Sequence, residues 1–568
     1  MAALQTEIRT LRGIQQSFVT VGFGAQVSDL EPKGAVFTKS WVVELLLDLA
    51  GYLPSNNLID AVAVEPSFGE GAFLIPMIGR LLDSCERFGR DPSECGDSIV
   101  AFELDRQSAA HARDLATTYL LSRGVTPQAA NTLTSVWIRT ADYLLESIAL
   151  RADFVIGNPP YIRLEDIPPQ TALLYRDAYA TMRGRADIYI AFFEAALHQL
   201  KTGGVCAFIC ADRWMRNQYG AELRKLIASK FSVEVVLEMH SADAFQDDVD
   251  AYPAITVIRK QMQHSTIVAS ADSQIKNIPT PTIVSLLFSA TKADMPKGLR
   301  AACVQSWFEG SDPWPCTSPE QLALLRRLEM DFSPLEASTR IGIGVASGND
   351  RIFITKDAGL VEPSRLLKLA LAKDIRGGSL SWSGNYLVDP WNAKGLVQLE
   401  HYPLLKSYFE AHRTALQTRH TAVKNLDGWF RTIDRVSHEL TARPKLYIAD
   451  IKERLDPVLD NGETYPHHNL YFIESDTWNL EILGGILIST VGQFFIESYG
   501  VRMRGGYLRF QAQYLRRIRV PKPEEITPVD AASLVKAFRE RDYQLANDTS
   551  IKIYGLNHDE KEILLGHR

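Results

Sequence analysis

A four-residue turn, Asn158-Pro159-Pro160-Tyr161, follows the apolar run 153–157 and combines residue types well suited to chemistry. The two prolines fix the backbone and remove two donors, so the carbonyls remain as acceptors. If the Asn158 side-chain oxygen and the Pro159 carbonyl accept both hydrogens of an NH2 group, its nitrogen lone pair becomes available. That lone pair can attack a methyl sulfonium held in line, and the Tyr161 ring offers a flat face for the substrate. The turn therefore predicts methyl transfer to an amino group by positioning and electrostatics, without a covalent intermediate.

A glycine-containing turn lies upstream in the segment 65–73, EPSFGEGAF. It follows the first expected strand and precedes a helical pattern. Gly69 and Gly71 permit a tight turn and a close backbone approach of a ligand, although a lone Gly-x-Gly is weak evidence because many strand-to-helix turns contain glycine. Glu65, followed by Pro66, ends the strand and could accept a hydrogen bond from a ligand ammonium group or from water. The turn is therefore a candidate cofactor site.

Two further acidic residues end the strands expected next in the chain. The carboxylate of Glu103 suits the paired hydroxyls of a ribose, and that of Asp142 could accept from an adenine amino group. Leu104 or Tyr143, which follow these acids, would then lie against the adenine ring. The alternative for each acid is an ordinary loop residue after a strand. Their order behind the glycine turn favours a nucleoside site.

These candidates follow a regular alternation of strand and helix patterns in the first 260 residues. Seven short, β-branched runs without polar alternation predict parallel strands buried on both faces; the runs are 61–65, 99–103, 136–139, 154–157, 205–210, 233–238 and 254–259. The pattern predicts an α/β fold with a seven-stranded, doubly wound, Rossmann-like methyltransferase domain over residues 1–262. We expect a linker or domain edge over 263–299 and a separate α+β domain over 300–568.

In this order the motifs resemble those of the gamma-class N6-adenine DNA methyltransferases of restriction-modification systems, the group of the TaqI methyltransferase. The match covers most of residues 33–260 and includes Thr38, the segments 187–193 and 203–205, and Phe245. One departure is Lys39, where the family commonly has proline, and it weakens the assignment of Thr38 alone.

The resemblance implies a cofactor, a substrate and a second domain. The cofactor is S-adenosyl-L-methionine, bound by Thr38, by the glycine turn, by the acids and their neighbours named above, and by Asn158. The substrate is double-stranded DNA, from which an adenine is flipped out so that its amino group reaches the site. Phe245 would pack on this adenine opposite Tyr161. Residues 300–568 would form a DNA target-recognition domain, because the segment 340–354 resembles the glycine-bearing strand near the start of such domains.

The net charge of −7 at first argues against a nucleic-acid partner, but the distribution of charge matters more than its sum. Residues 1–260 carry a net charge of −8 and the remainder +1. The segment 501–523 has six arginines, one lysine and no acid, which predicts a local basic cleft for phosphate or base-edge contacts. The alternative is a solvated basic strand face. The candidate DNA-binding residues are Arg502, Arg504, Arg509, Arg516 and Arg517.

Two other functions stay open from the sequence. The same turn would suit a methyltransferase acting on a glutamine side-chain amide or on RNA, because an amide NH2 poses the same chemical problem; the large C-terminal domain argues against this. The chain could instead be a non-catalytic DNA-binding or assembly subunit, and the complete motif set argues against that. No nuclease constellation is evident, so we expect cleavage to require a separate cognate restriction endonuclease.

Cysteines and apolar segments indicate the expected surroundings of the chain. None of the six cysteines forms a CxxC pair and no zinc ligand set is visible, so we expect no metal. The first residues lack the apolar core of a secretory signal, and no apolar run approaches 18 residues. We therefore expect no membrane association and a cytoplasmic location in a bacterial or archaeal cell.

Overall fold

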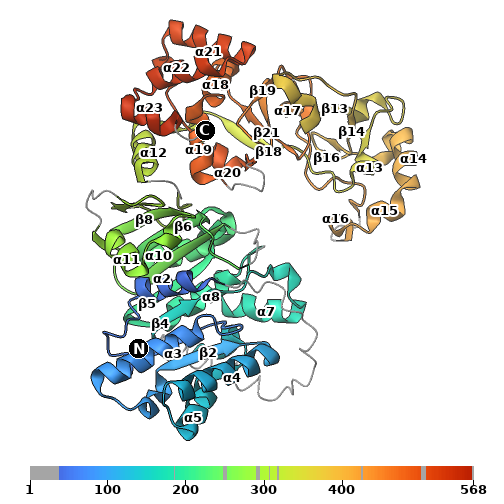
Figure 1. Cartoon of the computed structure of the whole chain (residues 1–568). Coiled ribbons are helices and arrows are strands. Elements are labelled where there is room, and N and C mark those ends of the chain that lie inside the picture. Colours follow the sequence, from blue (N-terminus) through green and yellow to red (C-terminus); the bar gives the residue numbers. More distant parts are fainter. Residues whose placement is uncertain are drawn as a thin grey trace, which may run out of the picture.

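The computed structural model describes residues 38–184, 186–246, 252–289, 295–305, 307–315, 319–423, 427–500 and 507–565 of the 568-residue chain. Figure 1 shows a lower lobe, coloured blue to green, that contains the first half of the chain. The second half, yellow to red, forms the upper part. The catalytic and cofactor candidates, from Thr38 to Phe245, all belong to the lower lobe.

One mixed sheet organises the lower lobe. In the described residues it has nine strands in the order β3-β2-β1-β4-β5-β7-β6-β8-β9, and all run in one direction except β7 and β9. The chain passes from β1 to opposite sides of that strand, so the carboxyl ends of β1 and β4 border a crevice of the kind that binds ligands in such sheets. The strands are Ala63–Glu65 (β1), Ile99–Glu103 (β2), Ile138–Thr140 (β3), Ala152–Gly157 (β4), Leu200–Ala211 (β5), Ser232–Ser241 (β6), Pro253–Arg259 (β7), Thr266–Asp272 (β8) and Leu299–Val304 (β9).

The sheet confirms the expected fold class but contains more strands than predicted. Strands are present at or near all seven expected runs, but β7 runs antiparallel to both of its neighbours and not parallel as predicted. Strands β8 and β9 add two more beyond residue 262. The segment 263–299, expected as a linker or edge, contains β8 and the helix α11 (Thr280–Ser289), so the sheet continues through it. Strand β8 was not predicted because it is only seven residues long and is surrounded by turn-forming Ser, Thr, Pro and Asn residues.

Helices cover both faces of this sheet because its strands alternate their side chains. In β5, Val205, Ala207 and Ile209 face one core, and Cys206, Phe208 and Cys210 face the other. The first core is covered by α2 (Ser40–Ala50), α3 (Leu74–Phe88), α4 (Arg106–Ser122), α5 (Pro127–Trp137) and α11. The second is covered by α6 (Tyr143–Glu146), α7 (Pro169–Ala178), α8 (Tyr189–Gln199), α9 (Arg213–Arg216) and α10 (Ala221–Lys230).

The second half contains two small sheets with a core of their own. The first has the order β11-β21-β17-β19 and the second β12-β14-β13-β20. Between them they bury a third cluster, which runs from Val345 to Phe472. The strands are Arg340–Ile343 (β11), Ile354–Thr355 (β12), Leu366–Ala370 (β13), Tyr386–Val388 (β14), Lys445–Ala449 (β17), Val458–Asp460 (β19), Tyr465–Pro466 (β20) and Leu470–Glu474 (β21).

A group of helices lies above the lower lobe and beside these sheets in Figure 1; α12 precedes the sheets in the chain and the other helices follow them. They are α12 (Pro319–Asp331), α18 (Leu480–Leu487), α19 (Thr490–Tyr499), α20 (Ala512–Leu515), α21 (Pro528–Glu540), α22 (Tyr543–Ile553) and α23 (His558–Leu565). Within the described residues no single helix is long and apolar enough to span a membrane; α18 and α19 meet that test only as a pair, across a bend of 64°.

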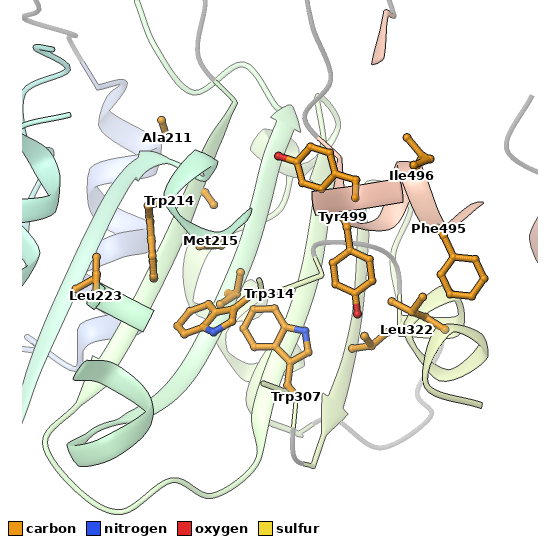
Figure 2. Packing of buried hydrophobic residues seen from close by; sticks show 14 of the residues in the cluster. Ala211, Trp214, Met215, Leu223, Trp307, Trp314, Leu322, Phe495, Ile496 and Tyr499 are labelled. Atoms are coloured by element: carbon orange, nitrogen blue, oxygen red, sulfur yellow. The ribbon is translucent and has the colours of Figure 1, made fainter. Parts of the chain in front are cut away.

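A buried aromatic cluster joins the two halves (Figure 2). Trp214 of α9 lies 4.9 Å from Trp314, measured between ring centroids, and Trp314 lies 5.2 Å from Trp307. Leu322 of α12 and Tyr499 of α19 belong to the same continuous core. Because this core extends from the sheet into the terminal helices, the two halves are packed together rather than tethered by a linker.

Candidate active site

The glycine turn after β1 places a buried carboxylate at the crevice. Glu65 is fully buried, and neither of its side-chain oxygens has a hydrogen-bond partner among the described residues. Burial raises the pKa of Glu65 well above its usual range, and the charge of Glu103 adds to this. Gly69 and Gly71 have φ angles of 53° and 90°, a conformation that favours glycine. The Glu65 side-chain oxygens can therefore accept hydrogen bonds from a ligand.

Glu103 at the end of β2 holds this turn in place. One of its oxygens accepts from the Gly69 backbone N–H and the other from the Asp105 N–H, both at 2.9 Å. Leu104 is 49% exposed beside it, so its side chain is available to a ligand ring. Pro66 lies against β4, since a Cβ on Gly157 would come within 3.3 Å of the Pro66 Cδ. These contacts bring the ends of β1, β2 and β4 together.

Asp142 and Tyr143 differ in their surroundings. The Asp142 carboxylate accepts from the Leu144 N–H at 2.9 Å and from the Tyr175 hydroxyl at 2.6 Å, and burial raises its pKa against these bonds. The Tyr143 ring is 2% exposed and stacks on Phe192 in the core. The expectation that Tyr143 faces a ligand ring is therefore wrong for its side chain, because its ring supports the sheet; Leu104 is the accessible alternative. Tyr175, on α7, is a site neighbour that the sequence did not indicate.

The turn after β4 is held by a segment from the start of the described chain. The Asn158 Nδ2 donates to the Thr38 Oγ1 at 3.2 Å, and Thr38 pairs in antiparallel fashion with Phe245. The Lys39 N–H donates to the Ala244 carbonyl at 3.0 Å. Thr38 therefore meets both Asn158 and Phe245, which are 87 residues apart in sequence.

Tyr161 and Phe245 form adjacent aromatic walls beside this turn. Their ring centroids are 6.4 Å apart and their planes are nearly perpendicular, at 80°. The Tyr161 hydroxyl is buried and has no hydrogen-bond partner among the described residues. Pro159 is buried and Pro160 is half-buried, so the turn is packed against the protein where it leaves β4. The two rings now touch edge to face, so a base stacked between them would require one ring to rotate.

Comparisons with known proteins agree with this arrangement. Residues 142–245, from Asp142 through the Asn158 turn to Phe245, match the Eco57I restriction-modification methylase family. Residues 372–520 match the TaqI-like C-terminal specificity domain. The chain is 42% identical to the type II methyltransferase M.PaeR7I of Pseudomonas aeruginosa over 95% of its length and 94% of that protein. It is 39% identical to M.XhoI of Xanthomonas vasicola, over 94% of its length and 99% of that protein.

The chain belongs to the type II DNA methyltransferases of restriction-modification systems. A third relative, M.BstVI of Geobacillus stearothermophilus, is 38% identical over 94% of the chain and 97% of that protein. The solved structure of the type IIL restriction-modification enzyme MmeI in complex with DNA matches 93% of this chain and 74% of its own, with 11% identity and a TM-score of 0.52, which shows a shared fold. The resemblance expected from the motifs is thereby confirmed.

The predicted DNA-binding arginines of this methyltransferase have unequal settings. Arg502 and Arg504 lie outside the described residues. Arg517 pairs with Asp312 at 3.3 Å and lies over the Tyr499 ring, and its side chain is only 25% exposed. These contacts leave less of the Arg517 side chain accessible to DNA than a fully exposed arginine would offer.

Arg509 and Arg516 also make internal contacts but keep accessible side chains. Arg509 pairs with Asp450 at 2.6 Å and is 40% exposed, and Arg516 donates to the Ile341 carbonyl at 3.1 Å and is 45% exposed. Both therefore retain surface that can contact a phosphate.

A buried ionic cluster at the ends of β5 and β6 was not expected from the sequence. Asp212 contacts Arg216 at 3.1 Å and the His240 Nε2 at 3.0 Å, while Glu238 contacts the His240 Nδ1 at 2.9 Å. Burial lowers the pKa of His240, but the hydrogen bonds to both carboxylates outweigh this and raise it to about 9. Arg216 also donates to the Gly500 carbonyl at 3.0 Å. The cluster thus connects the catalytic sheet to the segment that precedes Arg502. Only the acid after a strand, Asp212, was a visible signal.

Proposed function

We propose that this methyltransferase transfers a methyl group from S-adenosyl-L-methionine to N6 of an adenine flipped out of double-stranded DNA. The observation that carries the proposal is the Asn158–Tyr161 turn beside the second aromatic wall, Phe245, at the crevice edge. An amide side chain, a fixed prolyl carbonyl and flat rings together suit a planar NH2-bearing base.

The residues present fit this cofactor. The unpartnered buried carboxylate of Glu65 requires a cationic or N–H donor, which the amino group of S-adenosylmethionine would provide. Glu103 can accept from ribose hydroxyls, Leu104 offers an apolar face, and Asp142 keeps lone pairs for an adenine amino group. Pro66, Gly69 and Gly71 shape the backbone around them. When bound, the cofactor supplies an electrophilic methyl sulfonium.

The chain's own residues would act on the target amino group. The Asn158 side-chain oxygen and the Pro159 carbonyl accept its two hydrogens, and this draws electron density back to the nitrogen. Tyr161 and Phe245 hold the base and offset the few kcal/mol needed to unstack it. The specificity region, with Arg509, Arg516 and the basic segment around Arg502 and Arg504, would select the DNA site. A separate restriction endonuclease would cleave unmodified DNA.

Base mapping tests this proposal. The protein is expressed in a methylation-deficient host, and modified bases are mapped by long-read sequencing. We expect N6-methyladenine in one recurring sequence motif, and its absence with the Asn158→Ala variant. A methylated cytosine instead, or no modified base from protein that binds the cofactor, would overturn the proposal.

A competition assay addresses the other substrates. Labelled cofactor is offered with duplex DNA, RNA and a glutamine-containing release-factor protein at equal concentration. Label is expected on the DNA alone, and preferential labelling of RNA or protein would support the alternative methyltransferase functions.

A further inference from the structure

Three potential metal ligands meet in the specificity region, away from the methyl-transfer site. Asp350 begins α13 (Asp350–Phe353), and His467 and His468 occupy the turn between β20 and β21. One ligand atom from each of the three lies within 4.8 Å of the other two. The adjacent histidines were the only sign of this group in the sequence.

The backbone brings these residues together at the junction of the two small sheets. The turn from β20 to β21 passes from the second sheet to the first, and the segment 344–353 passes from β11 in the first to β12 in the second. Val345 pairs with His467, and the His468 N–H donates to the Val345 carbonyl at 3.0 Å. A Cβ on Gly344 would lie 2.3 Å from the His467 and Pro466 carbonyl oxygens, so glycine is required for this approach.

His467 brings a buried ring to the group. Its side chain is 6% exposed, and its Nε2 lies 3.2 Å from the Asp350 Oδ2, within ion-pair distance. The His467 and His468 ring centroids are 4.1 Å apart. The Nδ1 makes no hydrogen bond within the described part of the chain, and burial of an unpaired ring nitrogen is costly, so this imidazole favours a bound cation.

We propose that Asp350, His467 and His468 bind one Zn²⁺ ion that links the two sheets of the specificity region. Two imidazoles and one carboxylate are a recognised zinc set, and the fourth position would hold water. Ligand atoms around tetrahedral zinc lie about 3.4 Å apart for bonds of about 2.0–2.2 Å. Rotation of the exposed Asp350 and His468 side chains closes the remaining distance and gives the ion a path of entry.

The test uses the full chain without a histidine tag, stripped with a chelator and dialysed. Zn²⁺ is titrated in competition with a chromophoric chelator, and thermal unfolding is followed with and without the metal. We expect one Zn²⁺ per chain and a higher unfolding temperature when it is bound. His468→Ala and Asp350→Asn, both at exposed positions, should each weaken binding at least about tenfold and remove the temperature shift.

A matched control and an overturning result complete the experiment. His401→Ala removes an exposed histidine of the same region and should bind Zn²⁺ as the parent does. The proposal fails if the stripped protein binds no Zn²⁺ at micromolar concentrations, or if His468→Ala and Asp350→Asn bind it as tightly as His401→Ala. Neither result bears on methyl transfer, because these residues take no part in the proposed reaction.

Discussion

Glu65 and Asn158 occupy the ends of neighbouring parallel strands, but their environments prepare them for different tasks. Glu65 is a fully buried carboxylate with no hydrogen-bond partner among the described residues, which disfavours its charged form until a donor arrives. Asn158 is oriented by the Thr38 hydroxyl, so its amide is set before any substrate binds. Binding and catalysis should therefore be separable by single substitutions.

The first prediction concerns Asn158. Asn158→Ala should lower kcat for DNA methylation by about 100- to 1000-fold, because one preorganised acceptor of the amino group is lost. Cofactor affinity should change by less than about threefold, as measured by calorimetric titration. Asn131→Ala, at an exposed position on α5, is the control and should retain full activity. Full turnover by Asn158→Ala would contradict the assigned chemistry.

The second prediction concerns Glu65 and pH. Because the folded-state pKa of Glu65 is raised, the folded protein binds the proton more tightly than the unfolded chain. Its contribution to stability is complete below the unfolded value of 4.5 and is lost as pH rises through the folded pKa. Without cofactor at pH 8, the free energy of unfolding of Glu65→Gln should therefore exceed that of the parent by about 1 kcal/mol or more, which thermal unfolding measures as a higher unfolding temperature. This difference should shrink toward pH 5.

The same substitution should weaken cofactor binding. Loss of a charged acceptor costs about 1.5–3 kcal/mol, which is roughly a 10- to 100-fold lower affinity. Glu70→Gln, at an exposed position in the same turn, should alter neither stability nor affinity. A Glu65→Gln protein that is no more stable at pH 8 than at pH 5, relative to the parent, would refute this account.

At the scale of elements, the sequence predicted those structures that local patterns specify. Continuous β-branched runs marked the first seven strands, and glycine or proline marked the turns after β1 and β4. Strand β8 was missed because its short run lies among turn-forming residues. Strand β9 was missed because it pairs only with β8, which was itself not predicted. Tyr143 was misjudged, since a tyrosine after a strand can point to either face and only the packing with Phe192 decides.

Residues that meet only through the fold escaped prediction for a similar reason. Tyr175 reaches Asp142 from a helix 33 residues away, and His240 reaches Asp212 from the next strand of the chain. Asp350 and the two histidines are more than 100 residues apart and meet where the chain crosses between two sheets. Long-range approach of this kind leaves no periodic pattern in a sequence.

The third prediction concerns the segment that joins Asn158 to Phe245. Thr38→Val keeps the shape of the side chain but removes the hydroxyl that accepts from the Asn158 amide. We expect kcat to fall about 3- to 10-fold, the effect of one ordinary hydrogen bond, with little change in cofactor affinity. Thr38→Ser retains the hydroxyl and should retain the parent kcat in the same steady-state methylation assay. If Thr38→Val instead weakened cofactor binding at unchanged kcat, Thr38 would be a cofactor ligand rather than a support for Asn158.

At the scale of the molecule, the target-selecting half must stay in a fixed position relative to the catalytic crevice. Hydrogen bonds reinforce the aromatic cluster of Figure 2. The Trp314 backbone N–H donates to the Met215 carbonyl at 2.7 Å, and the Tyr514 hydroxyl donates to the Asn217 side-chain oxygen at 3.1 Å. Arg216 links the Asp212 carboxylate to the Gly500 carbonyl across the same boundary. A buried boundary of this kind should make the two halves unfold together.

The last prediction follows from that boundary. Trp314 is fully buried, stacks on Phe308 at 4.4 Å and meets Trp214 edge to face, so Trp314→Ala should cost about 3–5 kcal/mol of unfolding free energy. In scanning calorimetry the parent should show one cooperative transition and Trp314→Ala two, because the sheet domain and the specificity region lose their shared core. Trp429→Ala removes an equally large side chain from the separate core of the specificity region and should lower stability without uncoupling the sheet domain in this way. Since DNA must be held over the crevice, Trp314→Ala should also raise KM for DNA far more than it changes cofactor affinity. A single transition at the parent temperature would show that the aromatic cluster does not couple the two halves.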